Sequence, residues 1–138
     1  MRLLASTDFA LRVLMRLAAE PEALRSTEVL AREVGVPRNH IHKILQELAG
    51  LGLARTVRGV RGGVALAKPA AEITLGNVVR ALEREQVLVE CFRADGGACC
   101  FNPGCRLQTV LGGAREAFLR HLDRVTLASM AGMPRAAA

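Results

Sequence analysis

Apolar residues recur at intervals of three and four along two stretches near the start of the chain, and this spacing predicts amphipathic helices. The first helix covers 7–19, with Ser6 or Thr7 as its cap, because a hydroxyl oxygen can accept from the free backbone N–H groups of a first helical turn. The second helix is shorter, covers about 27–34, and has a hydroxyl residue at 26 or 27 as its cap. Both are expected to bury one face.

A tight turn separates the second helix from a third, which runs to about Leu51. Gly35 allows the positive φ of such a turn, and Pro37 suits the first position of a helix. A short helix, a glycine turn and a helix with polar residues at its start form the helix-turn-helix pattern, in which the start of the second helix reaches base edges in the major groove. The candidate DNA contacts are Arg38, Asn39, His40, His42 and Lys43.

Two strand-like runs follow, at 53–57 and 64–67, and the glycine-rich segment 58–63 between them predicts a hairpin. Beside a helix-turn-helix such a hairpin is a wing. Arg58 and Arg61 would then supply positive charge to phosphates or enter the minor groove. The same helices and hairpin also occur as an ordinary packing unit, so each feature alone is weak and their combination carries the prediction.

The second half of the sequence predicts a helix at 75–84, a loop rich in Cys and Gly at 90–105, and then a long amphipathic helix. The apolar face of that last helix consists of Leu107, Leu111, Ala114, Phe118, Leu122 and Val125. So small a chain offers this face no obvious partner, so we expect it to pack against a second copy. The fold class is mostly α with a small β-hairpin: a winged helix-turn-helix domain over 1–70 and a sensor and dimerisation region over 71–138.

The charge distribution supports a nucleic-acid partner for the first half. The formal net charge is +6, and residues 1–70 hold eleven Lys and Arg against six Asp and Glu. The excess lies almost wholly within 38–68, and a local positive field attracts polyanions. With no Trp or Tyr and only four Phe, the chain lacks the aromatic surface that stacks single-stranded bases. No segment has the length of a membrane span or a clear secretory signal, so we expect a cytoplasmic protein that acts on double-stranded DNA.

Four cysteines, Cys91, Cys99, Cys100 and Cys105, lie within fifteen residues of one another among glycines and a proline. In the cytoplasm such a group indicates metal ligands or redox groups rather than disulfides. Thiolates bind both iron–sulfur clusters and zinc, but close pairs of the CxxC type, which structural zinc sites favour, are absent here. Adjacent side chains diverge, so Cys91, Cys99 and Cys105 are the preferred ligands and Cys100 is spare. Zinc, a disulfide, or plain burial of the thiols remain the alternatives.

At this point the sequence resembles a known family, the winged-helix iron–sulfur repressors of the IscR and NsrR type, and most closely the branch that responds to nitric oxide. The resemblance covers the chain to about residue 131. The matching segments are 7–12 (Thr-Asp-Phe-Ala-Leu-Arg), 35–37 (Gly-Val-Pro), 50–53 (Gly-Leu-Gly-Leu), 58–63 (Arg-Gly-x-x-Gly-Gly), 73–76 (Ile-Thr-Leu-Gly), 89–92 (Val-Glu-Cys-Phe) and 99–107, which ends in Cys-Arg-Leu.

The resemblance implies a homodimer joined by the long C-terminal helices and a 4Fe-4S cluster held by Cys91, Cys99 and Cys105. It also implies Asp8 as the fourth ligand, donated by the partner subunit. An Asp in a first helical turn is equally favoured by the helix dipole, so Asp8 has a structural explanation as well. Nitrosylation or loss of the cluster would then change the spacing of the two recognition helices and release the operator.

Two features depart from the IscR branch, which has a His three residues after its last cysteine and a 2Fe-2S cluster. Here Gln108 stands at that place, the interval between Cys91 and Cys99 is longer, and Cys100 is additional. Cys100 could take the place of Cys99, so either of the two can be the middle ligand. Either an iron-status regulator of the IscR type or a zinc-stabilised winged-helix interaction module is the alternative function. An enzyme is not expected, because no group is evident that would orient a Cys–His nucleophile pair.

Overall fold

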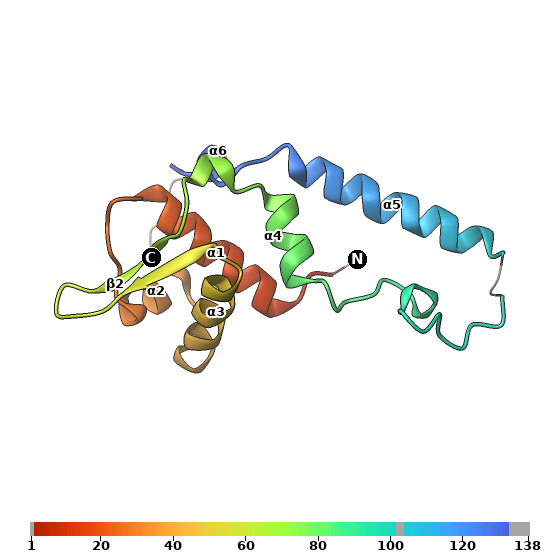
Figure 1. The fold of residues 1–138 in the computed structure, drawn as a ribbon, viewed down its shortest axis with the longest axis horizontal. Helices are drawn as coiled ribbons and strands as arrows, with labels where there is room; N and C mark the ends of the chain where they lie inside the picture. Colours follow the sequence, from red (N-terminus) through yellow and green to blue (C-terminus); the bar gives the residue numbers. More distant parts are fainter. Residues whose placement is uncertain (1, 102–103, 133–138) are drawn as a thin grey trace.

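The computed structural model describes residues 2–101 and 104–132, and Figure 1 shows their arrangement. The α-helices are α1 (Ala5–Ala19), α2 (Thr27–Val34), α3 (Arg38–Gly50), α4 (Leu75–Leu82), α5 (Arg106–Asp123) and α6 (Leu127–Met130). The strands β1 (Ala54–Val57) and β2 (Gly63–Leu66) form one antiparallel hairpin, and two short 3-10 turns lie at Ala70–Glu72 and Glu90–Phe92. The expected fold class is therefore confirmed. None of the described helices is long and apolar enough to cross a membrane.

One apolar core holds α1, α2, α3 and the hairpin together. Its fully buried members include Leu14 and Val13 of α1, Leu30 of α2 and Leu48 of α3. Residues of the second half join the same core: Leu127 of α6 is fully buried, and α6 packs on α1. Side chains that recur at helical spacing in the sequence thus meet in one place, as the periodicity predicted.

The hairpin is a wing that projects from this core, at the left in Figure 1. Its register pairs Ala54 with Leu66 and Val57 with Gly63. The segment at Arg25 also pairs with β2. The N–H of Arg25 donates to the carbonyl of Val64 at 3.0 Å, and the N–H of Val64 donates to the carbonyl of Arg25 at 2.8 Å. A Cβ on Gly63 would lie 2.9 Å from both the backbone N and the O of Arg25. The glycine is therefore what lets the two backbones approach so closely.

The second half forms an arm. After α4 the chain runs out through the cysteine loop and returns along α5, which ends beside α4 (Figure 1). An antiparallel bridge between Thr74 and Thr126 joins the segment before α4 to the segment after α5. Thr74 and Thr126 also cap α4 and α6 through their side chains, as expected, and Ser26 caps α2.

One expectation about a helix was wrong. The first helix begins at Ala5, with Leu4 at the cap position and no side-chain cap; Thr7 lies two residues inside it with its side chain buried on the inner face, so it cannot cap the start. In α5 the buried residue is Leu119, which lies outside the predicted stripe. Leu107 of the stripe is 62% exposed, so one chain does not cover this end of the stripe.

Candidate nucleic-acid interface and cysteine loop

Helix α3 presents its polar residues to solvent at the end that a recognition helix uses. The turn before it is built as the sequence predicted: Gly35 has a φ of 67°, and the N–H of Val36 closes α2 by donating to the carbonyl of Ala31. Pro37 lies one position earlier than expected, as the cap of α3. The apolar side of α3, with Ile41 and Leu48, is buried against the core. The five candidate DNA contacts, Arg38, Asn39, His40, His42 and Lys43, are all exposed.

Three of these five residues border one hollow. Asn39, His40 and Lys43 line a hollow of about 590 Å³ between α3, the start of α1 and the segment after α4. Arg38 and His42 do not line it. Arg38 lies 3.8 Å from Glu28 of α2, and both side chains are well exposed. Such an exposed pair contributes little and leaves the guanidinium available to a stronger anion.

His40 also contacts the first helix. Its ring meets the ring of Phe9 edge-on, with centroids 6.2 Å apart and an angle of 77° between the planes. The guanidinium of Arg12 lies over the Phe9 ring, 5.6 Å from its centre. Arg12 in turn forms an ion pair with Asp8 at 2.5 Å. A continuous series of contacts therefore connects Asp8 to the recognition helix.

The wing carries Arg58 and Arg61 at its tip, where both are exposed and Val60 between them is entirely so. The turn is closed by the N–H of Gly62 donating to the carbonyl of Gly59 at 2.9 Å, and Gly59 has a φ of 113°. The tip thus presents two cations beside the bare backbone of Gly59 and Gly62. This arrangement suits contact with phosphates.

An ion-pair network fixes the base of the wing, and sequence reasoning missed it. Glu33 of α2 accepts from Arg16 Nε at 2.8 Å and from Arg25 Nη1 at 3.1 Å, and all three side chains are largely buried. Glu20 pairs with both arginines, and the hydrogen bond from Arg16 lowers the pKa of its carboxyl group. The i, i+4 spacing of Arg16 and Glu20 was a signal for one pair. The pairs to Glu33 depend on tertiary structure.

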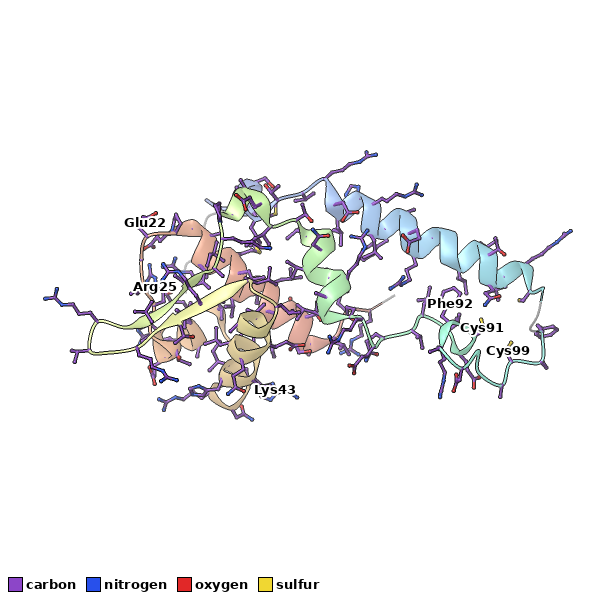
Figure 2. All side chains as sticks on the ribbon, in the orientation of Figure 1. Glu22, Arg25, Lys43, Cys91, Phe92 and Cys99 are labelled. Carbon is purple, nitrogen blue, oxygen red and sulfur yellow. The ribbon has the colours of Figure 1, made fainter. Side chains whose placement is uncertain are left out.

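The cysteine loop lies at the far end of α5 from the recognition helix. Figure 2 shows Cys91 and Cys99 there, well separated from Lys43 on α3. Cys91, Cys99 and Cys105 are half-buried, whereas Cys100 is exposed. Among residues 2–101 and 104–132, no three Cys, His, Asp or Glu side chains are grouped as a ready-made metal site.

Hydrogen bonds nevertheless draw the neighbours of these three cysteines together. The N–H of Ala98 donates to Glu90 Oε1 at 3.3 Å, which joins the residues just before Cys99 and Cys91. A Cβ on Gly97 would lie 2.6 Å from the Glu90 side chain, so the loop folds tightly back on itself here. Gln108 Nε2 donates to the carbonyl of Cys91 at 3.2 Å and connects it to the start of α5. Three soft, half-buried donors on one folded loop fit an iron–sulfur cluster or zinc.

Asp8 is not part of this loop in the same chain. It lies in the first turn of α1, half exposed and paired with Arg12. The structure therefore brings Cys91, Cys99 and Cys105 to one loop and leaves Asp8 and the recognition helix elsewhere.

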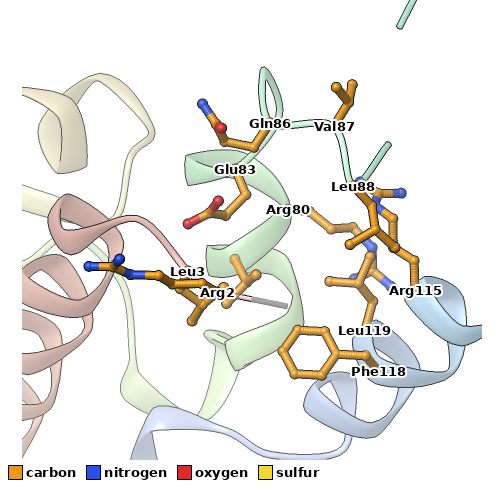
Figure 3. Close-up of a pocket in the computed structure, with 11 residues that line it drawn as sticks. Arg2, Leu3, Arg80, Glu83, Gln86, Val87, Leu88, Arg115, Phe118 and Leu119 are labelled. Carbon is orange, nitrogen blue, oxygen red and sulfur yellow. The ribbon is translucent and has the colours of Figure 1, made fainter. Parts of the chain in front are cut away.

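A second hollow, of about 390 Å³, lies between α4, α5 and the N-terminal segment. Figure 3 shows Leu3 from the N-terminal segment, Arg80 from α4, Glu83 directly after α4, and Phe118 and Leu119 from α5 around it. Its mixture of apolar side chains and arginines has no reactive group at its centre. No catalytic arrangement is found among the side chains described around it.

The fold and the exposed cationic helix and wing define a winged-helix DNA-binding protein with a cysteine-bearing arm. Residues 3–132 match the Rrf2 family, described as iron-dependent transcriptional regulators, and the chain belongs to this family. It is thus a DNA-binding transcriptional regulator and not an enzyme.

The relatives agree with this assignment. The HTH-type transcriptional regulator NsrR of Geobacillus kaustophilus (strain HTA426) is 45% identical over 131 residues, which cover 94% of this chain and 89% of that protein. The regulator of the same name from Halalkalibacterium halodurans is 42% identical over 92% of this chain and 88% of that protein.

Solved structures share the fold. T. potens IscR has a TM-score of 0.76 at 22% identity, over 99% of this chain and 94% of that one. CymR, the global cysteine regulator of B. subtilis, has a TM-score of 0.79 at 21% identity, over 98% of this chain and 99% of that one.

Proposed function

We propose that this chain is a homodimeric transcriptional repressor that senses nitric oxide through a 4Fe-4S cluster. Cys91, Cys99 and Cys105 would hold the cluster, with Asp8 of the second copy as the fourth ligand. The iron of such a cluster would supply the site at which nitric oxide binds. The relatives named NsrR support this proposal, and T. potens IscR supports the wider class.

The observation that carries the proposal is the difference among the four cysteines. Three are half-buried, and hydrogen bonds through Glu90 and Gln108 draw their neighbours together, whereas Cys100 is exposed. Thiolates with this setting are suited to soft metal centres. Gln108 donates to the backbone beside Cys91, so it contributes to the shape of the loop rather than to a ligand set of the 2Fe-2S type.

The path from sensor to DNA runs through α1. Asp8 pairs with Arg12, Arg12 lies over the Phe9 ring, and that ring contacts His40. A change at Asp8 would thus reach the recognition helix through three side-chain contacts. A ligand shared between subunits would also set the distance between two recognition helices, on which operator affinity depends.

We further propose that residues 1–70 bind DNA and that residues 71–138 sense and dimerise. The division is functional, since Leu127 and Ile73 of the second part complete the core of the first. The exposed apolar face of α5, with Leu107 at 62% and Val110 at 65% exposure, supports contact with a second copy.

The first experiment is purification without oxygen, with assays of iron, acid-labile sulfide and zinc. We expect brown protein with iron and sulfide, bleached by Cys99→Ala but not by the neighbouring Cys100→Ala, which serves as the matched control. Colourless protein that contains zinc would instead support a zinc-stabilised interaction module.

The second experiment is an anisotropy titration of cluster-loaded, cluster-free and nitric-oxide-treated protein on one pseudo-palindromic operator duplex. We expect tight binding by the loaded form and weaker binding by the other two. Equal affinity in all three forms would exclude nitric oxide sensing and leave a DNA-binding regulator. A response to iron depletion without a response to nitric oxide would favour an iron-status regulator of the IscR type.

A further inference from the structure

Helix α5 is attached to the DNA-binding part near one end. Its buried residue, Leu119, lies close to the C-terminus, and α4 is the element against which this part packs. Toward the other end Leu107 and Val110 are exposed, and the helix extends away from α1, α2 and α3 (Figure 1). The direction in which α5 points is therefore decided where it meets α4.

The first attachment at this junction is a pair of backbone hydrogen bonds. The N–H of Leu75 donates to the carbonyl of Val125 at 2.9 Å, and the N–H of Leu127 donates to the carbonyl of Ile73 at 2.9 Å. These bonds surround the single residue pair Thr74 and Thr126. They fix the point at which α5 ends, but a bridge at one pair offers little resistance to rotation about that point.

The second attachment resists this rotation. Arg80 donates to Asp123 twice, from Nη1 to Oδ1 at 2.5 Å and from Nη2 to Oδ2 at 2.7 Å, in the two-bond geometry that defines orientation as well as distance. The hydrogen bond from Arg80 lowers the pKa of Asp123, so the carboxylate stays charged at neutral pH.

Gly76 lies one helical turn before Arg80, on the same face of α4. A Cβ at this position would lie 2.0 Å from Asp123 Oδ1 and 2.9 Å from the Asp123 backbone nitrogen. Only a glycine therefore permits α4 and the end of α5 to approach this closely. The carboxylate of Asp123 contacts the bare backbone of Gly76 on one side and the guanidinium of Arg80 on the other.

We propose that the Arg80–Asp123 pair, which packs against the backbone of Gly76, sets the angle between α5 and the DNA-binding part and thereby selects the spacing of operator half-sites. This inference rests on the proposed dimer joined through α5. The 18 residues of α5 span about 27 Å, so a rotation of about 10° at the junction displaces its far end by about 5 Å. That displacement exceeds the rise of one base pair, about 3.4 Å.

The experiment uses the full chain, loaded as purified, and half-sites that the wild type selects from a random duplex pool. Affinity is measured on duplexes whose spacer changes in steps of one base pair. We expect a sharp optimum for the wild type. For Asp123→Asn we expect the optimal spacer length to shift, or the preference for the optimal spacer over its neighbours to fall by at least about threefold. For Arg80→Lys we expect a smaller change, because lysine keeps the charge but not the paired geometry.

Glu116→Gln is the matched control for loss of charge, since Glu116 acts on Arg80 only through its charge and forms its ion pair with its neighbour Arg115, so the two hydrogen bonds to Asp123 are kept. Its spacer profile should equal that of the wild type. A profile of Asp123→Asn within about twofold of this control, in protein that circular dichroism shows to be folded, would overturn the proposal; Arg80→Lys provides the same comparison if Asp123→Asn does not fold.

A wild type that selects no paired half-sites would instead contradict the proposed function. Small-angle scattering of the same proteins then tests separately whether the pair sets the angle of α5, because scattering reports how far the arm extends in the absence of DNA. Identical scattering by Asp123→Asn and Glu116→Gln would show that the pair does not set the angle of α5.

Discussion

Replacing Gly63 by Ala should destabilise the protein because β2 has no room for a side chain where it passes Arg25. The new Cβ would lie 2.9 Å from the backbone N and O of Arg25, and backbone atoms cannot move aside as a flexible side chain would. Relief requires the two segments to separate, which stretches the hydrogen bonds of 3.0 and 2.8 Å between Arg25 and Val64.

The size of the effect follows from these contacts. Overpacking of this kind costs about 1–3 kcal/mol, and each of the two hydrogen bonds is worth about 1 kcal/mol net. We therefore expect a loss of about 3 kcal/mol in the free energy of unfolding. For a chain of 138 residues this corresponds to a fall in Tm of about 10 °C.

The assay is thermal unfolding followed by circular dichroism, with Gly50→Ala as the matched control. Gly50 is the last residue of α3, and a Cβ there would meet nothing within 4 Å. Both variants change the flexibility of the unfolded chain in the same way, so their difference isolates the contact with Arg25. Equal Tm values for the two variants would refute the reasoning and show that the wing can shift away from Arg25 at little cost.

Three further predictions concern charge. Arg61→Ala should weaken binding to all duplexes and reduce the slope of log K against log salt by about one unit, measured by anisotropy at several salt concentrations; an unchanged slope would mean that the wing tip does not reach a phosphate. Arg38→Ala should cost about 1–3 kcal/mol on the operator and much less on random DNA; an equal loss on both would identify a phosphate contact instead. Because Arg16 lowers the pKa of Glu20 below its ordinary value of 4.5, the contribution of Glu20 to stability is complete above that value and is lost as the pH falls through the lowered pKa. Urea unfolding of Glu20→Gln should accordingly show a weaker loss of stability between pH 6 and about pH 3 than the wild type, and parallel curves would contradict this.

Much of the fold was readable from the sequence because the relevant information is local. Apolar spacing located α1, α2, α3 and α4 to within a few residues, since one buried face per helix imposes that spacing. Gly35 and the glycines of the wing identified turns for which their backbone freedom is needed. The clustering of four cysteines, likewise, is visible in the sequence alone.

Other features depend on residues far apart in the chain. The start of α1 was misplaced because a hydroxyl residue can either cap a helix or, like Thr7, turn into the core, and only packing distinguishes the two. The residue of α5 that is buried within one chain is likewise decided by the packing on α4, which buries Leu119 and leaves Leu107 of the predicted stripe exposed.

The sequence by itself determined the set of elements, the recognition helix, the wing and the candidate ligands, because propensity, periodicity and ligand chemistry act over short distances. Only the tertiary structure showed that Glu33 joins Arg16 to Arg25, that Gly63 admits the backbone of Arg25, and that Arg80 binds Asp123 across 43 residues. The physical reason is that these contacts join side chains whose separation along the chain carries no information about their distance in space. They form only once burial of the common core has fixed the helices relative to one another.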